Sequence, residues 1–259
     1  RFIRCSLARA TTNMNNLDVL DEPPHTPPSL HPVDDFWLKL SECDCYPHDV
    51  TPVTERLPGT AAFAAGAGLW RPPGTDDLPD FPYGGLMVLG HNLDTETGYR
   101  NALDAGVSHG DPSVPGHRMM STWAGPYKLL DRAGVKRTDF FFTNVFVGLM
   151  KGDSNVGKFT RQANAEYTAW RRQFLAYQVD VMRPRAVLVL GTHACNDVAE
   201  IVSPSPWPRG KLPPPTPIIG RLFDWETTLV PAFHTSYQKR LAQDAATLQT
   251  AWGSTGAPT

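Results

Sequence analysis

Four clusters of polar residues each follow or interrupt a short apolar run. They are residues 90–94 (GHNLD), 143–144 (TN), 191–193 (GTH) and 234–240 (HTSYQKR). Amide, imidazole and carboxylate side chains can hold a water molecule, read a hydrogen-bonding edge or stabilise a developing negative charge. If the apolar runs are parallel strands of one sheet, their carboxyl ends lie along one edge, where open α/β sheets bind ligands. We therefore expect the four clusters to form one site.

The apolar runs predict the fold. Four of them are short, rich in apolar residues and bounded by turn residues, as strands buried on both faces are: residues 85–90, 140–147, 186–191 and 228–233. Helical patterns lie at residues 121–133, 160–182 and 236–252, and Thr160 is the expected N-cap of the second. This alternation predicts the α/β class, a three-layer α/β/α sandwich around a central four-stranded, mainly parallel sheet.

Proline is frequent and clustered, with 25 residues in 259. Because proline lacks a backbone donor and fixes φ, these stretches are not helix interiors or central strands. We expect an irregular arm over residues 1–34, a loop before the first strand and a surface insertion over residues 203–217. The length fits a single domain over residues 1–259.

Composition excludes several classes of protein. With 41% hydrophobic and 19% charged residues, the chain is neither disordered nor a coiled coil. Its apolar runs are shorter than the ~18–20 residues of a membrane span. Four scattered cysteines make no disulfide framework and fit a cytoplasmic protein.

The charge is unevenly distributed along the chain. The formal net charge is −2, yet residues 1–119 carry 8 Lys/Arg against 16 Asp/Glu and residues 120–259 carry 16 against 10. The basic half is a hint of an anionic partner.

A different kind of site is suggested by residues 152–158 (GDSNVGK), which have the spacing of a phosphate-binding P-loop. Phe159 follows, where the motif needs Ser or Thr to hold magnesium, and no apolar run ends in the Asp that would complete such a site. A Gly-rich surface loop is the favoured interpretation. Nucleotide hydrolysis that depends on Lys158 is the alternative.

With their flanking sequence, the four clusters resemble the core motifs of the uracil-DNA glycosylase superfamily. The stretches are GLMVLGHN, STWAGPYKLLDRAGVKRTDFFFTNVFVGL, RPRAVLVLGTHAC and LVPAFHTSYQKR, in that order between residues 85 and about 245. The resemblance implies an enzyme that flips a base out of DNA and hydrolyses its N-glycosidic bond, leaving an abasic site. It implies no metal, and no cofactor, because the four-cysteine iron–sulfur pattern of some branches is absent.

The resemblance assigns the catalytic roles to three residues. Asn92 would position the attacking water, and because an amide is a poor base, a carboxylate would assist it, Asp94 or else Glu96. His234 would donate a hydrogen bond to the departing base, where negative charge develops. The alternative for Asn92 and Asp94 is that they are ordinary turn residues.

Base binding is assigned in the same way. Asn144 would read the base edge, since its amide offers both a donor and an acceptor. Trp123 would stack on the flipped base, with core packing as an equal alternative. His91 is a further base-binding candidate, for which a structural role is the stronger interpretation.

The last cluster is the expected DNA-binding segment. Thr235 and Ser236 would open a helix whose free N–H groups hold a phosphate, and Tyr237 would wedge into the gap left by the flipped nucleotide. Lys239 and Arg240 would add positive charge, or simply form the polar face of an amphipathic helix. DNA is the expected partner, and we expect a monomer that is not attached to a membrane.

Departures from the family pattern bear on the substrate. After the catalytic position, the family usually has Pro, and uracil enzymes often have a Tyr that acts as a gate; this chain has Leu93 and Asp94 there. Thr235 replaces the Pro of the last motif. Residues 95–119 form a long polar loop. GHNLDTETGY, TW and FFTNVFVGL are similar to bacterial anti-phage glycosylases that remove glucosylated hydroxymethylcytosine. We expect such a bulky modified cytosine, with uracil as the alternative and a catalytically silent DNA-binding module as a third interpretation. A bacterial cytoplasmic location follows from this resemblance.

Overall fold

The computed structural model describes most of the chain. The described residues are 31–53, 81–104, 107–108, 118–119, 121–136, 138–153, 164–202, 205–208, 211, 213–234 and 238–254. Within these ranges, no helix combines the length and the apolar character that crossing a membrane requires.

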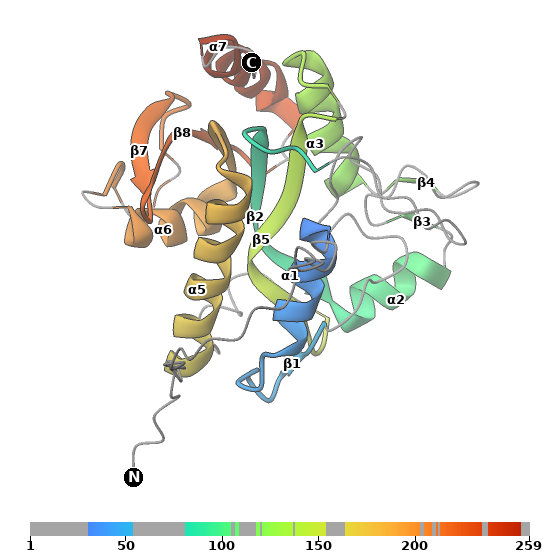
Figure 1. The fold of residues 1–259 in the computed structure, drawn as a ribbon. Coiled ribbons are helices and arrows are strands. Elements are labelled where there is room, and N and C mark those ends of the chain that lie inside the picture. The colour runs from blue at the N-terminus through green and yellow to red at the C-terminus, as the bar shows by residue number, and fades with distance from the viewer. Residues whose placement is uncertain are drawn as a thin grey trace, which may run out of the picture.

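A six-stranded sheet forms the centre of the molecule, with strand order β1-β5-β2-β6-β8-β7 (Figure 1). Its strands are β1 (Val50–Thr51), β2 (Leu86–Thr95), β5 (Phe140–Met150), β6 (Ala186–Leu190), β7 (Ile218–Leu222) and β8 (Trp225–Ala232). The four inner strands are parallel, which confirms the predicted core, and β1 and β7 add antiparallel edges. These edges escape a search for apolar runs because β1 has two residues and β7 alternates between half-buried and exposed positions.

Helices cover both faces of this sheet (Figure 1). They are α1 (Pro32–Ser41), α2 (Glu96–Asp104), α3 (Ser121–Arg132), α5 (Ala165–Met182), α6 (Gly191–Ile201) and α7 (Leu241–Ser254), with a 3₁₀ turn η1 (Gln238–Arg240). Side chains of α1, α5 and α6 share one hydrophobic cluster with Met87 and Leu89 of β2. Side chains of α3 and α7 share a second cluster with Leu86 and Val88. The predicted three-layer sandwich is confirmed, with an α5/α6 face and an α3/α7 face.

The segment after the first apolar run differs from its prediction. β2 continues to Thr95, so Asn92 and Asp94 lie in the strand and not in a turn after it. Pairing with β5 supports this extension, with an irregular register between Asn92 and Asp94. Residues 95–119 are not one long loop, because they contain α2 and the small parallel pair β3 (Val107–Ser108) and β4 (Arg118–Met119).

Three helix boundaries also differ. The N-cap of α5 is Asn164, whose Oδ1 accepts the Tyr167 N–H at 2.6 Å, so the prediction of Thr160 is wrong; Thr160 lies outside the described residues. Either side chain is a good cap, so composition alone did not discriminate. The helix expected over residues 236–252 divides into η1 and α7. The irregular arm cannot extend to residue 34, because Pro32 opens α1 at N1, where its missing N–H costs nothing; residues 1–30 lie outside the description.

The proline-rich insertion packs on the sheet's helical layer. In its described parts it is irregular, as expected, but Trp207 is only 5% exposed and belongs to the α5/α6-face cluster. The Trp207 indole N–H donates to the Cys195 carbonyl oxygen of α6 at 2.8 Å. Lys211 is exposed, and Arg209 lies outside the described residues. Trp207 therefore fixes this part of the insertion against α6.

Truncating this anchor tests the packing. Trp207→Ala should lower the free energy of unfolding by about 3–5 kcal/mol, because it leaves a cavity and removes the indole donor. Urea unfolding at neutral pH measures the change. The control Lys211→Ala, at an exposed site of the same insertion, should stay within about 0.5 kcal/mol of the parent. Equal stability of Trp207→Ala and the parent would contradict the packing described.

Candidate functional site

The inner strands separate at their carboxyl ends. β2 and β6 pair from Leu86 with Ala186 to Leu89 with Val189. The chain of β6 then enters α6 at Gly191, whereas β2 continues along β5 to Thr95. The chain runs from β2 to β5 on one side of it and then crosses β2 to form β6 on the other side, so the strand order reverses between β2 and β6. A separation of this kind at the reversal of strand order is where open α/β sheets bind ligands.

Asn144 projects from the α3/α7 face at this edge. Phe140 and Phe142, which alternate with it in β5, belong to the α3/α7 cluster, and strand alternation carries that orientation to Asn144. Asn92 lies further along β2, where its register partner Phe146 belongs to the cluster of the α5/α6 face and its side chain forms a hydrogen bond with that of His91.

Two adjacent features fix the Asn144 side chain. Gly90 is the direct partner of Asn144 in the parallel register, and Asn144 is buried. A Cβ at Gly90 would overlap Asn144 Oδ1, so the amide occupies the space that a larger residue would fill. Gly90 is thus a residue of the site that sequence reasoning had treated only as a turn residue.

Asn92 holds a polar atom that the described residues do not satisfy. Its backbone pairs with Phe146 of β5. Its side-chain Nδ2 is buried and makes no hydrogen bond within the described part of the chain. Because a buried amide donor without a partner is costly, this N–H group is suited to a water molecule or a substrate atom.

Asp94 is oriented by the start of α2. Its Oδ1 accepts the backbone N–H of Thr95 at 2.7 Å, and Thr95 Oγ1 accepts the N–H of Gly98 at 2.9 Å. Glu96, the other carboxylate considered, receives a short hydrogen bond from the Thr51 hydroxyl of β1. Both carboxylates therefore have roles in local structure, and assistance to the water by Asp94 stays a prediction.

His234 lies two residues beyond the end of β8 at Ala232. Gly191 lies directly beneath it: a Cβ there would be 3.3 Å from His234 Cβ, and its φ of +84° is one that glycine adopts readily. The ring is exposed, yet the neighbouring protein desolvates it enough to lower the pKa of His234 below the usual value.

Asp244, which the sequence did not single out, and Arg240 contact the residue before His234. Asp244 of α7 is buried, and its Oδ2 accepts the backbone N–H of Phe233 at 3.0 Å. The Arg240 guanidinium lies 4.3 Å from the centre of the Phe233 ring. Arg240 and Lys239 both lie in η1 and are exposed.

Several predicted residues cannot be compared with the structure. Trp123 lies in the first turn of α3, but its side chain is outside the description. Thr235, Ser236 and Tyr237 lie outside the described residues, as does Lys158 of the P-loop alternative. Their assignments stay predictions.

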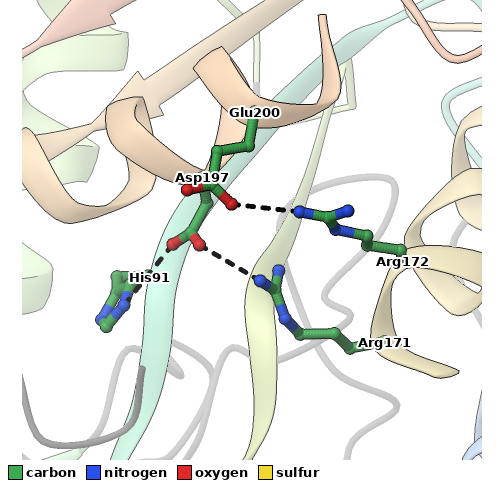
Figure 2. A network of polar contacts seen from close by, with 5 residues as sticks. All are labelled: His91, Arg171, Arg172, Asp197 and Glu200. Atoms are coloured by element: carbon green, nitrogen blue, oxygen red, sulfur yellow. Dashed lines mark hydrogen bonds and ion pairs between the residues drawn. The ribbon is translucent and has the colours of Figure 1, made fainter. Parts of the chain in front are cut away.

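His91 lies on the opposite face, in a buried network that Figure 2 shows. Its Nε2 is 3.6 Å from Asp197 Oδ2 of α6, and Asp197 Oδ1 is 3.2 Å from Arg171 Nη2 of α5. The three side chains are only 10%, 6% and 4% exposed. We call His91, Asp197 and Arg171 the His91 network. The exposed ring of His193 lies 5.0 Å from the His91 ring, and the Arg171 guanidinium lies 4.0 Å from the centre of the Phe146 ring.

Burial sets the charge state of the network. Desolvation raises the pKa of Asp197 to about 6, although the Arg171 charge pulls it down. Desolvation, followed by the neighbouring His193, lowers the pKa of His91 to about 4. At neutral pH the network therefore consists of a neutral imidazole, a carboxylate and a guanidinium.

The sequence contained one signal of this network. Arg171 falls on the buried stripe of α5 with Tyr167, Phe174 and Gln178, where a charge needs a partner. Asp197 occupies a buried position of α6. Helical periodicity identifies both positions as buried, but it does not pair residues of two helices.

The neutral state of His91 has a measurable consequence. Between its folded pKa of about 4 and the ordinary value of 6.5, the unfolded chain binds a proton at His91 that the folded chain does not, so His91 reduces stability as pH falls. His91→Gln lacks this loss. From pH 7.5 to pH 5, the variant should gain stability relative to the parent by about 1–2 kcal/mol, measured by urea unfolding at both pH values.

Asp197 acts in the opposite direction in that experiment. Its raised pKa means that the folded chain keeps a proton that the unfolded chain releases between the usual value of 3.8 and about 6. Asp197 is present in both proteins, and its pKa is set by burial and by Arg171, Glu200 and Arg172, so its contribution largely cancels in the comparison. The same difference in stability at both pH values would contradict a neutral His91.

The family model described as the uracil DNA glycosylase superfamily matches residues 100–254. A comparison with curated proteins finds no match. The matched stretch contains Asn144 and His234 with their strands, while Asn92 in β2 precedes it.

Proposed function

The chain belongs to the uracil DNA glycosylase superfamily, and on that premise we propose that it is a DNA glycosylase that flips out a modified pyrimidine and hydrolyses its N-glycosidic bond. Membership suggests this activity and suggests DNA as the partner. One observation carries the proposal to particular residues. Asn92 and Asn144 lie in β2 and β5 beyond the point where β2 separates from β6, and His234 follows the end of β8 at the same edge of the parallel strands.

The reaction needs side chains of the kinds found at Asn92, Asn144 and His234. The bond between the sugar C1′ and the ring nitrogen breaks, its electron pair leaves with the base, and a water oxygen bonds to C1′ while its proton passes to solvent. In this proposal Asn92 holds the water, which is consistent with its buried, unsatisfied Nδ2 within the described chain. Asn144 pairs with the edge of the base, and Asp94 assists by attracting the positive charge that develops on the sugar.

His234 stabilises the departing base. Its lowered pKa keeps the imidazole neutral at physiological pH, so it acts as a hydrogen-bond donor to an anionic oxygen of the base and not as a strong acid. Gly191 beneath it and Asp244 behind Phe233 hold this donor in place.

We propose a bulky modified cytosine as the base, glucosylated hydroxymethylcytosine of phage DNA above all. Leu93 supports this choice, because it is buried in the cluster of the α5/α6 face and therefore points away from the face of Asn144. A side chain in that orientation does not block a substituent on the pyrimidine ring. Base stacking by Trp123, and DNA contact by Thr235, Ser236, Tyr237, Lys239 and Arg240, belong to the same proposal, whereas the buried contacts of His91 with Asp197 favour the structural role.

The same proposal extends to the setting of the enzyme. We infer a single-domain monomer that acts without metal or cofactor in the bacterial cytoplasm as an anti-phage defence. The three described cysteines are free thiols, which supports a reducing compartment.

Removing the proposed catalytic groups tests the mechanism. Asn92→Ala and His234→Ala should each lower the single-turnover rate of base release by about 10²–10³-fold, because each removes a group that acts at the transition state. The measurement is cleavage at abasic sites in a labelled oligonucleotide after alkali. DNA affinity should change little, since phosphate contacts supply most of it.

His48→Ala provides a matched control, because the His48 side chain is 94% exposed in the segment before β1. It should release base at the parental rate. Parental rates in both Asn92→Ala and His234→Ala would overturn the roles assigned. DNA binding by the parent without base release from any substrate would favour the silent binding module.

A panel of DNAs tests the substrate. Phage DNA carrying glucosylated hydroxymethylcytosine should yield the modified base, detected by mass spectrometry of the released bases, while ordinary cytosine DNA yields none. Release of uracil from uracil-containing oligonucleotides, with nothing from the phage DNA, would contradict a bulky modified base and favour the uracil enzyme.

A further inference from the structure

The end of β2 is the least supported part of the candidate site. Beyond Leu89, the described pairing of β2 is with β5 alone, because β6 has turned into α6. Even that pairing shifts register between Asn92 and Asp94. A strand that has lost one neighbour has unpaired backbone groups on that side, so side-chain contacts there add to its support.

The His91 network supplies such contacts from the opposite face. His91 is the residue next to Asn92, and its ring reaches across the separation to Asp197 of α6. Arg171 of α5 holds the other oxygen of Asp197, so β2 and α5 both contact one carboxylate of α6 (Figure 2).

The network also contacts β5, the strand that pairs with Asn92. Phe146 is the partner of Asn92 in the β2–β5 register. The Arg171 guanidinium lies 4.0 Å from the centre of the Phe146 ring, and the His91 ring packs edge-on against it at 5.3 Å. The backbone at Asn92 is thus held on both sides, through its neighbour His91 and through its partner Phe146.

Asn92 depends on this support more than a well-bonded side chain would. Its Nδ2 has no hydrogen-bond partner among the described residues, so that end of the amide is not fixed by a bond of its own. The Asn92 side chain does form a hydrogen bond with the side chain of His91, so the position of the amide follows from its backbone and from His91. A displacement of about 1 Å in a group that orients a reactant costs on the order of 10²-fold in rate.

We propose that His91, Asp197 and Arg171 are positioning residues that hold the end of β2 so that Asn92 meets the water of the reaction. This inference rests on the proposed function and deepens it. His91 then acts from the α5/α6 face, behind the sheet, and the base is read on the other face by Asn144.

The chain contains a matched control in the same two helices. Arg172 and Glu200 are the neighbours of the network on α5 and α6, and they form a similar ion pair of 3.0 Å at the surface, with exposed fractions of 41% and 38% (Figure 2). Removing the charge of Glu200 therefore perturbs an α5–α6 pair without touching β2.

The experiment compares single-turnover base release by His91→Ala, Asp197→Asn and Glu200→Gln on the substrate that the parent cleaves. His91→Ala and Asp197→Asn should lower the rate about 10–100-fold, with the dissociation constant for DNA within about threefold of the parent. Glu200→Gln should stay within about twofold. His91→Gln should recover part of the rate, because its amide can still donate to Asp197.

A second comparison separates positioning from a general loss of structure. If the network acts through Asn92, adding His91→Ala to Asn92→Ala should lower the rate no further. Rates are measured under conditions in which circular dichroism shows that each variant is folded. Asp197→Asn leaves the buried Arg171 without its ion-pair partner and is the variant at risk of unfolding. His91→Ala keeps that pair intact and carries the test in that case.

Three results would overturn the inference. Parental rates in folded His91→Ala, together with an inactive Asn92→Ala, would show that the network is structural only. A further loss of rate on adding His91→Ala to Asn92→Ala would show that it acts elsewhere. A parent that releases no base from any DNA in the panel would overturn the proposed function and the inference together. The first two results would overturn the inference alone and leave the proposed function standing.

Discussion

The separation of β2 from β6 beyond Leu89 and Val189 is the constraint on which the rest of the site depends. While the strands pair, both faces of the sheet are filled by apolar side chains and no ligand has access. Once β6 turns into α6 at Gly191, the strand ends carry polar side chains into the space left between them. Because of the same separation, β2 has no neighbouring strand among the described residues on the β6 side at Asn92. The change that exposes the strand ends therefore also reduces the support of β2.

Asn144 and the His91 network lie on opposite faces of the sheet. On the α3/α7 face, Asn144 follows Phe140 and Phe142 of β5 and fits beside Gly90. On the α5/α6 face, His91 of β2 contacts Asp197 of α6, which pairs with Arg171 of α5. His234 lies against Gly191, where α6 begins.

Burial gives the site a charge pattern that exposed residues of the same types would lack. Desolvation keeps the imidazoles of His91 and His234 neutral at physiological pH, since the pKa of each is lowered. Asp197 stays ionised there because its pKa, although raised to about 6, remains below neutrality, with Arg171 as its partner. Neutral donors suit a reaction in which negative charge develops on a departing base.

The sequence by itself determined the four parallel inner strands, the helices between them and the edge where the polar clusters end, because apolar runs and helical periodicity are local properties. It also identified Asn92, Asn144 and His234 as candidates through the motifs around them. Only the tertiary structure decided that Asn92 lies within a strand, and that Asp197 and Arg171 meet behind it. Those outcomes depend on which strands pair and which helices touch, and contacts between residues distant in the chain leave no periodic signal in either segment.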